Sequence, residues 1–190
     1  GEVYSSAAAN GSFDLSAGSF DIEAKGATIG QSGGNTLEIV SSGQVDAEAD
    51  GAIHITSVAG NALSIGLIDA GTNDVTLIGD SGVTHTGNDA ATDVIAGTLK
   101  IQNASAGSAG DITLDTAVTD ANLNGANISI HDGDGLNLTG INATGSLSVE
   151  TSGAITDSAA TTIAVSGLTV FNAGSNDITL GDDAGDTTNF

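Results

Sequence analysis

The stretch AGTNDVTLIGD, residues 70–80, combines the two signals on which the fold prediction depends. Gly, Asn and Asp in its first half favour a tight turn, and the triplet VTL at 75–77 then alternates apolar, polar, apolar. Related stretches follow at residues 107–117, GSAGDITLDTA, and at residues 173–183, AGSNDITLGDD. Alternation with period two over a few residues indicates a short strand with one buried face. The chain therefore repeats a unit made of a turn followed by a strand.

The same apolar–polar–apolar triplet recurs along the whole chain, and clusters of Gly, Asn, Asp and Ser separate the copies. No stretch shows sustained helical periodicity, so we expect an all-β chain. The triplets begin at Phe13, Phe20, Leu37, Ile53, Leu63, Val75, Leu99, Ile112, Ile128, Leu136, Leu147, Ile163, Leu168 and Ile178.

The spacing of apolar positions predicts how these strands are arranged. Val75, Leu99, Leu123 and Leu147 follow one another at intervals of 24 positions. A fixed period of this size is typical of a solenoid, in which each repeat stacks on the one before it. We therefore expect Leu99, Leu123 and Leu147 to lie on consecutive coils of one parallel sheet.

This spacing predicts a parallel β-helix of roughly eight coils with about 24 residues per coil. It fills residues 1–190 as a single repeat region, with less regular coils over about 1–36. An antiparallel sandwich also has short strands at close intervals, and local alternation alone does not distinguish it from a β-helix. Two observations favour the β-helix. Apolar strand positions recur at intervals of 24 residues, and aromatic residues make up only 3% of the chain, with no Trp or Met.

The chain is strongly acidic, and this excludes some partners. It has 24 Asp and Glu against Lys25 and Lys100, giving a formal charge of −22. Nucleic acids need a basic surface, and anionic membranes attract basic segments, so neither is an expected partner. We interpret the charge as a solvated acidic surface.

Cysteine is absent, which excludes disulfides and thiolate metal sites. No apolar run resembles a signal peptide or a membrane span. The sequence begins and ends in mid-pattern, and we expect it to be a segment of a longer protein.

Three stretches resemble the repeat shaft of filamentous haemagglutinin-type adhesins, which are large bacterial exoproteins of the two-partner secretion class. They are GAIHITSVAGNALSIG at residues 51–66, NASAGSAGDITLDTAV at 103–118 and GSLSVETSGAITDSAATTIAVSGLTVFNAGSNDITL at 145–180. The resemblance covers the chain from about Ser12 onward. It implies a right-handed parallel β-helix, export to the cell surface, and roles in attachment and biofilm.

One departure from that family limits what the resemblance implies. The family's secretion domain carries Asn-Pro motifs, and this chain has no proline. The resemblance is therefore to the shaft and not to the secretion domain. Passengers of type I secretion and of autotransporters have similar repeats, so the export route stays open.

Histidines and carboxylates are the residues from which a catalytic site is usually built. The chain has His54, His85 and His131, which are scattered, and we expect His54 to face solvent from an outward strand position. Paired carboxylates can cleave glycans. Acidic glycans, however, need basic residues in the groove of the enzyme, and neutral glycans generally need aromatic platforms. The chain is poor in both. We expect no enzyme.

Two carboxylate clusters are candidate calcium sites, because Ca²⁺ takes six to eight oxygen ligands. HDGDG contains Asp132 and Asp134, and GDDAGD contains Asp182, Asp183 and Asp186. Neither cluster has the tandem nonapeptide of calcium-binding β-rolls or the distal Glu of an EF-hand. An Asp/Gly turn without metal is the simpler interpretation. Asp132 and Asp134 are kept as candidate calcium ligands, and no other cofactor is expected.

The sequence thus predicts a structural and adhesive segment of a secreted or surface-displayed bacterial adhesin, which acts as a stiff shaft in attachment or biofilm. Its expected location is extracellular, at the bacterial cell surface. Its expected partners are glycans or proteins of a host, of a neighbouring cell or of the matrix, together with self-association end to end or laterally. The alternative is a calcium-dependent, self-assembling surface-layer or matrix protein.

Overall fold

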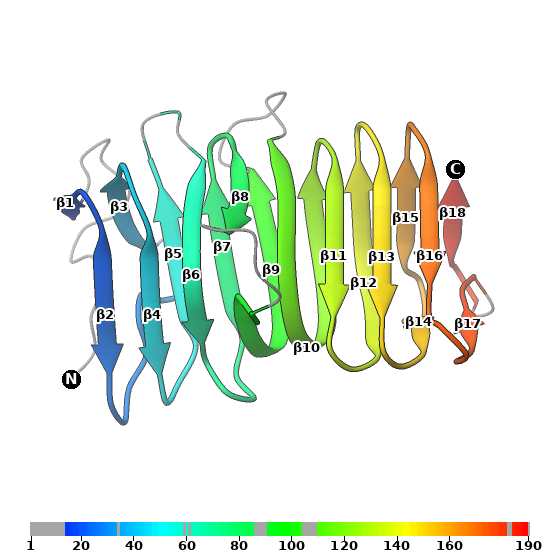
Figure 1. Cartoon of the computed structure of the whole chain (residues 1–190), viewed down its shortest axis with the longest axis horizontal. Helices are drawn as coiled ribbons and strands as arrows, with labels where there is room; N and C mark the ends of the chain where they lie inside the picture. The colour runs from blue at the N-terminus through cyan, green and yellow to red at the C-terminus, as the bar shows by residue number, and fades with distance from the viewer. Residues whose placement is uncertain are drawn as a thin grey trace.

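The computed structural model describes residues 14–33, 35–58, 60, 62–85, 91–103, 110–181 and 184–189. These residues form an all-β solenoid of about seven turns, roughly 22 residues apart, whose strands pair in parallel. In Figure 1 the strands lie side by side along one long axis, with β1 at one end and β18 at the other. No helix in the described part of the chain has the length and apolar character needed to span a membrane.

The strand bounds show that most strands are short. The strands are β1 Leu15–Ala17, β2 Phe20–Ala24, β3 Leu37–Ser41, β4 Val45–Ala49, β5 Ile53–Ser57, β6 Leu63–Asp69, β7 Val75–Gly79, β8 Gly82–His85, β9 Val94–Asn103, β10 Asp111–Gly125, β11 Ile128–Asp132, β12 Leu136–Ala143, β13 Leu147–Thr151, β14 Ile155–Asp157, β15 Thr162–Val165, β16 Thr169–Asn172, β17 Ile178–Thr179 and β18 Thr187–Asn189.

The strands pair into three rows that run along the solenoid. Row one consists of β1, β3, β5, β7, the ends of β9, β10 and β12, and then β15 and β18. Row two consists of β2, β4, β6, then β8 with the start of β9, the start of β10, and β11, β13 and β16. Row three joins the middle of β10 to the start of β12, to β14 and to β17.

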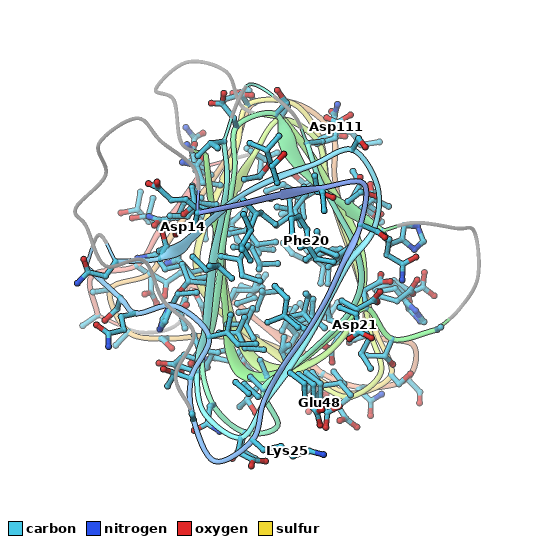
Figure 2. All side chains as sticks on the ribbon, turned by 90° about the vertical axis from the view of Figure 1, so that its left-hand side faces the viewer. Asp14, Phe20, Asp21, Lys25, Glu48 and Asp111 are labelled. Atoms are coloured by element: carbon cyan, nitrogen blue, oxygen red, sulfur yellow. The ribbon has the colours of Figure 1, made fainter. Side chains whose placement is uncertain are left out.

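The core lies between these rows and is filled by alternate residues of each strand. In row one, Ile55 pairs with Leu77, and Leu77 pairs with Ile101, so the inward side chains form a ladder across successive turns. All three side chains are buried. Within the described residues the buried core contains Ala, Val, Ile and Leu and no aromatic side chain, whereas Phe20 and Phe171 pack on it while partly exposed. Figure 2 shows Phe20 directed inward and Asp14, Asp21 and Glu48 on the outside.

The structure confirms the all-β solenoid, the parallel pairing and most of the predicted inward positions. The triplet at Leu168 is an exception. Leu168 and Val170 are 73% and 44% exposed. Leu147 pairs with Thr169, and Val149 pairs with Phe171, so Thr169 and Phe171 occupy the inward positions of β16. The register is therefore shifted by one residue from the prediction, which exchanges the two faces of the strand.

The predicted 24-residue period holds only in places. Val75 pairs with Leu99, 24 positions later, as expected. Leu99, however, pairs with Ala121 of β10. Leu123 lies two residues further along β10 and pairs with Ile101 instead. Leu147 belongs to row two and does not stack on Leu123 at all. The prediction of three consecutive rungs is wrong for this reason.

The cause of this error is variation in the length of the corners. Ile112 pairs with Ile128, only 16 positions later, whereas Gly82 pairs with Asp111, 29 positions later. The solenoid accordingly has about seven turns roughly 22 residues apart, where the sequence predicted roughly eight coils of about 24.

The inward and outward faces can be compared by introducing an aspartate on each face. Leu123 is 1% exposed in the core, whereas Thr76 lies on the outward side of β7. We expect Leu123→Asp to lower the free energy of unfolding by at least about 3 kcal/mol, because it buries an unpaired charge. Thr76→Asp should change it by no more than about 0.5 kcal/mol. Urea unfolding followed by circular dichroism measures both, and equal losses would contradict the assignment of the faces.

Candidate functional site

A groove follows the outward side of row one. Its first hollow has a volume of about 440 Å³ and is lined by Ser32, Gly33, Thr36, Glu38, His54, Thr56, Thr76, Ile78, Lys100 and Gln102. A second hollow of about 270 Å³ is lined by Gln102, Asn122, Leu123, Asn124, Gly140, Ile141, Asn142, Thr162 and Ala164. Gln102 lines both hollows, so they are neighbouring parts of one groove that crosses β3 to β15.

The groove differs from the rest of the molecule in charge. The chain carries a formal charge of −22, but the lining residues include one carboxylate, Glu38, and one ammonium group, Lys100. Hydroxyl and amide groups supply most of the remaining polarity. The groove is thus a strip that is close to neutral on an acidic surface, and it presents hydrogen-bond donors as well as acceptors.

Parallel pairing places these side chains in regular lines. His54 pairs with Thr76, Thr76 with Lys100, and Lys100 with Asn122. A second line contains Asn142, whose Nδ2 donates to Asn124 Oδ1 over 3.2 Å. Neighbouring strands lie about 4.8 Å apart, so polar groups recur along the groove at that interval.

His54 departs from the prediction that it faces solvent. Its side chain is on the outward side of β5, but the residue is only 9% exposed. The segment that contains Ile29 and Gly30 packs against it: the His54 backbone N–H donates to the Ile29 carbonyl over 2.6 Å. Gly30 has φ +67°, and a Cβ at this position would meet the His54 carbonyl. Glycine is therefore required for this close approach.

The buried imidazole of His54 is unusual in its bonding. Its Nδ1 makes no hydrogen bond with any residue that the structure describes. Burial lowers the pKa of His54, and the charge of Asp74 works against this effect. The imidazole is therefore neutral at pH 7, and its unpaired nitrogen lies in the wall of the larger hollow.

The other two histidines lie on row two. His85 Nδ1 is 3.5 Å from Asp93 Oδ2, and His131 Nδ1 is 2.8 Å from Asp115 Oδ1. Asp115 pairs with His131 in register on the next strand. Pairing between turns joins Asp115 to His131, whereas His85 ends β8 and Asp93 immediately precedes β9 in the same turn.

The two candidate calcium ligands are placed differently. Asp132 is fully buried, and its carboxylate accepts three hydrogen bonds: from Thr116 Oγ1 at 2.8 Å, from the Val118 backbone N–H at 3.1 Å and from the Asp134 backbone N–H at 2.9 Å. Burial raises the pKa of the Asp132 carboxyl, and these hydrogen bonds oppose the rise. Asp134 is exposed. The carboxylate of Asp132 therefore stabilises a corner of the solenoid, and calcium binding there stays a prediction.

The second carboxylate cluster is only partly described. Asp186 Oδ1 accepts a hydrogen bond from the Thr161 backbone N–H over 2.9 Å, which joins two turns. Asp182 and Asp183 lie outside the described residues.

The sequence did not predict the two contacts between histidine and aspartate or the burial of His54. One signal was available: when the triplets at 112–114 and 128–130 are aligned, Asp115 falls opposite His131. No comparable signal predicts that His85 lies close to Asp93, because no motif fixes the length of the segment between them. The segment with Ile29 pairs with β5 beside His54, and strand alternation does not reveal this contact.

Comparison with known proteins gives one match. Residues 125–189 match a family described as repeats of unknown function (DUF5649). This region contains β11 to β18. No curated protein and no solved structure matches the chain. Together, the match and the solenoid support a repeat-type protein, and the resemblance to haemagglutinin-type adhesins stays a prediction.

The lowered pKa of His54 predicts a pH dependence of stability. Below pH 6.5 the unfolded chain takes up a proton on this imidazole, whereas the buried imidazole takes it up only at lower pH. We expect the free energy of unfolding to fall, relative to that of His54→Gln, as the pH decreases below about 6.5. Urea titrations between pH 5 and 8 measure this difference, and parallel curves for the two proteins would contradict it.

Calcium binding can be separated from simple charge screening. Since the Asp132 oxygens already accept hydrogen bonds, we expect sodium and calcium at matched ionic strength to raise the melting temperature about equally. Thermal melts of the native chain and of Asp134→Asn measure this. A rise specific to calcium that disappears in Asp134→Asn would show a calcium site instead.

Proposed function

We propose that the chain is a stiff segment of a secreted or surface-displayed bacterial adhesin, and that its groove is an attachment surface. The proposal follows the haemagglutinin-type resemblance and includes the right-handed winding that this resemblance implies. Right-handed crossovers are also the general rule for parallel strands. It places the segment outside the cell and assigns it no catalytic role.

The observation that carries the proposal is the near-neutral groove along an uninterrupted parallel row. An acidic surface repels anionic polymers, but the groove lining has one carboxylate and one ammonium group. The described residues of this lining include no Phe, Tyr or Trp on which a sugar could stack, so recognition would rest on its hydroxyl and amide side chains. These side chains match the hydroxyl and amide groups of uncharged glycans. A polymer laid along the solenoid axis would meet polar groups on successive strands, and many weak contacts would then add up.

The stiffness in this proposal comes from the pairing of strands between turns. Successive turns are joined by backbone hydrogen bonds along rows one and two, and from β10 onward along row three as well. The inward ladders of Ile, Leu and Val hold the rows together. Bending the solenoid requires these contacts to open on one side. A segment built in this way keeps an attachment surface at a fixed distance and orientation from whatever anchors it.

Groove binding can be tested with glycan arrays that include neutral, amide-bearing and acidic sugars. Thr76→Arg puts a long charged side chain into the larger hollow, and Thr156→Arg puts the same side chain on an exposed position of β14 outside the groove. We expect native chain to bind neutral or amide-bearing glycans, Thr76→Arg to bind them at least about tenfold more weakly, and Thr156→Arg to bind like native. Each tenfold change in the dissociation constant corresponds to about 1.4 kcal/mol of binding free energy.

Two results would contradict this proposal. If none of the glycans binds at millimolar concentration, the groove is not an attachment surface for sugars. If both arginine variants weaken binding equally, the bound surface lies elsewhere on the solenoid. Circular dichroism of the two variants confirms that each is folded before binding is compared.

A further inference from the structure

Row two contains a break that brings three metal-ligating side chains together. β10 runs without interruption from Asp111 to Gly125. On the preceding turn, however, two separate strands pair with its first half: β8 pairs with Asp111–Thr113, and the start of β9 pairs with Thr116–Val118. His85 is the last residue of β8, and Asp93 immediately precedes β9. Asp115 lies opposite this break, and its backbone N–H donates to Asp93 Oδ2 over 2.8 Å.

These three side chains converge closely. One ligand atom from each of His85, Asp93 and Asp115 lies within 4.8 Å of the other two. Asp93 is only 5% exposed. Two carboxylates held this close repel each other, and a bound cation or a protonated imidazole relieves the repulsion. Neither lysine lies beside them, because Lys25 pairs with Glu23 and Lys100 lines the groove on row one. Among the described residues, the basic groups next to these carboxylates are the imidazoles of His85 and His131.

The imidazole of His85 is placed as a ligand would be. Its Nδ1 is buried and makes no hydrogen bond with the described residues, although Asp93 Oδ2 lies 3.5 Å away. Two ligands of a tetrahedral zinc ion, each at about 2.1 Å from the metal, are about 3.4 Å apart. The separation of the His85 nitrogen and the Asp93 oxygen therefore suits an ion between them.

We propose that His85, Asp93 and Asp115 bind a divalent transition metal of the zinc class, with water completing the coordination. A nitrogen ligand beside two carboxylates selects Zn²⁺ or Co²⁺ over Ca²⁺ and Mg²⁺, which prefer oxygen ligands alone. The ion links β8, β9 and β10 across the break in row two. This inference does not depend on the proposed adhesive function.

His131 is a positioning residue in this site. Its Nδ1 lies 2.8 Å from Asp115 Oδ1, on the strand that pairs with β10 on the other side. Hydrogen bonds to metal-ligating carboxylates orient them, and their loss typically weakens metal binding by about 10–100-fold. His131 thus fixes the direction in which Asp115 presents its carboxylate.

The test uses the full chain, stripped of metal with a chelator and kept in excess Mg²⁺ to occupy nonspecific acidic sites. We expect one equivalent of Co²⁺ to give the intense visible absorption of a four- or five-coordinate ion, and one equivalent of Zn²⁺ to remove it. His85→Ala should weaken binding at least about 100-fold, and His131→Ala about 10-fold. His54→Gln is the matched control and should bind as native does.

Nuclear magnetic resonance of the native chain keeps the proposal testable if His85→Ala does not fold. One equivalent of Zn²⁺ should shift the imidazole resonances of His85 and leave those of His54 unchanged. Unshifted His85 resonances would overturn the proposal. Undiminished Co²⁺ absorption in folded His85→Ala would also overturn it, because the ion would then be bound elsewhere.

Discussion

Parallel pairing between successive turns is the constraint on which the rest of this structure depends. A strand in row one exchanges backbone hydrogen bonds with the turns on both sides, as β5 does when the His54 N–H donates to Ile29 and the Ile53 N–H donates to Asp74. No turn is therefore stable as an isolated unit. The rows are held apart by a narrow core, in which Ala, Val, Ile and Leu alternate with outward polar residues. Large aromatic side chains would force the rows apart, and the two partly buried phenylalanines, Phe20 and Phe171, accordingly lie at its margins.

The same pairing also organises the outer surface. Because the register that aligns Leu77 with Ile101 also aligns Thr76 with Lys100, every inward ladder has a matching outward line of side chains. The groove of row one is such a set of lines. The cluster of His85, Asp93 and Asp115 arises where a row is interrupted and residues of neighbouring turns face one another across the break. Both features are products of stacking and have no counterpart in any single stretch of sequence.

The sequence predicted what depends on local alternation and missed what depends on the corners. Strand positions such as Leu37, Ile53 and Val75 were predicted correctly, because period-two alternation decides which residues point inward. The stacking of Leu147 on Leu123 was wrong, because the corners differ in length and no motif fixes them. For the same reason the proximity of His85 to Asp93 and Asp115 was not predicted. The burial of His54 was missed because strand alternation does not show that the segment with Ile29 and Gly30 bonds to β5.

The unequal corners have a consequence for how such chains diverge. Paired positions in neighbouring parts of this solenoid are 16 and 29 residues apart, so the hydrogen-bonded rows accommodate turns of different length. An insertion or deletion at a corner should therefore shift every later residue number and leave the rows in place. Selection on the fold therefore preserves the alternation within strands and tolerates drift in the distance between them. A lineage of such proteins loses its recognisable repeat length sooner than its architecture.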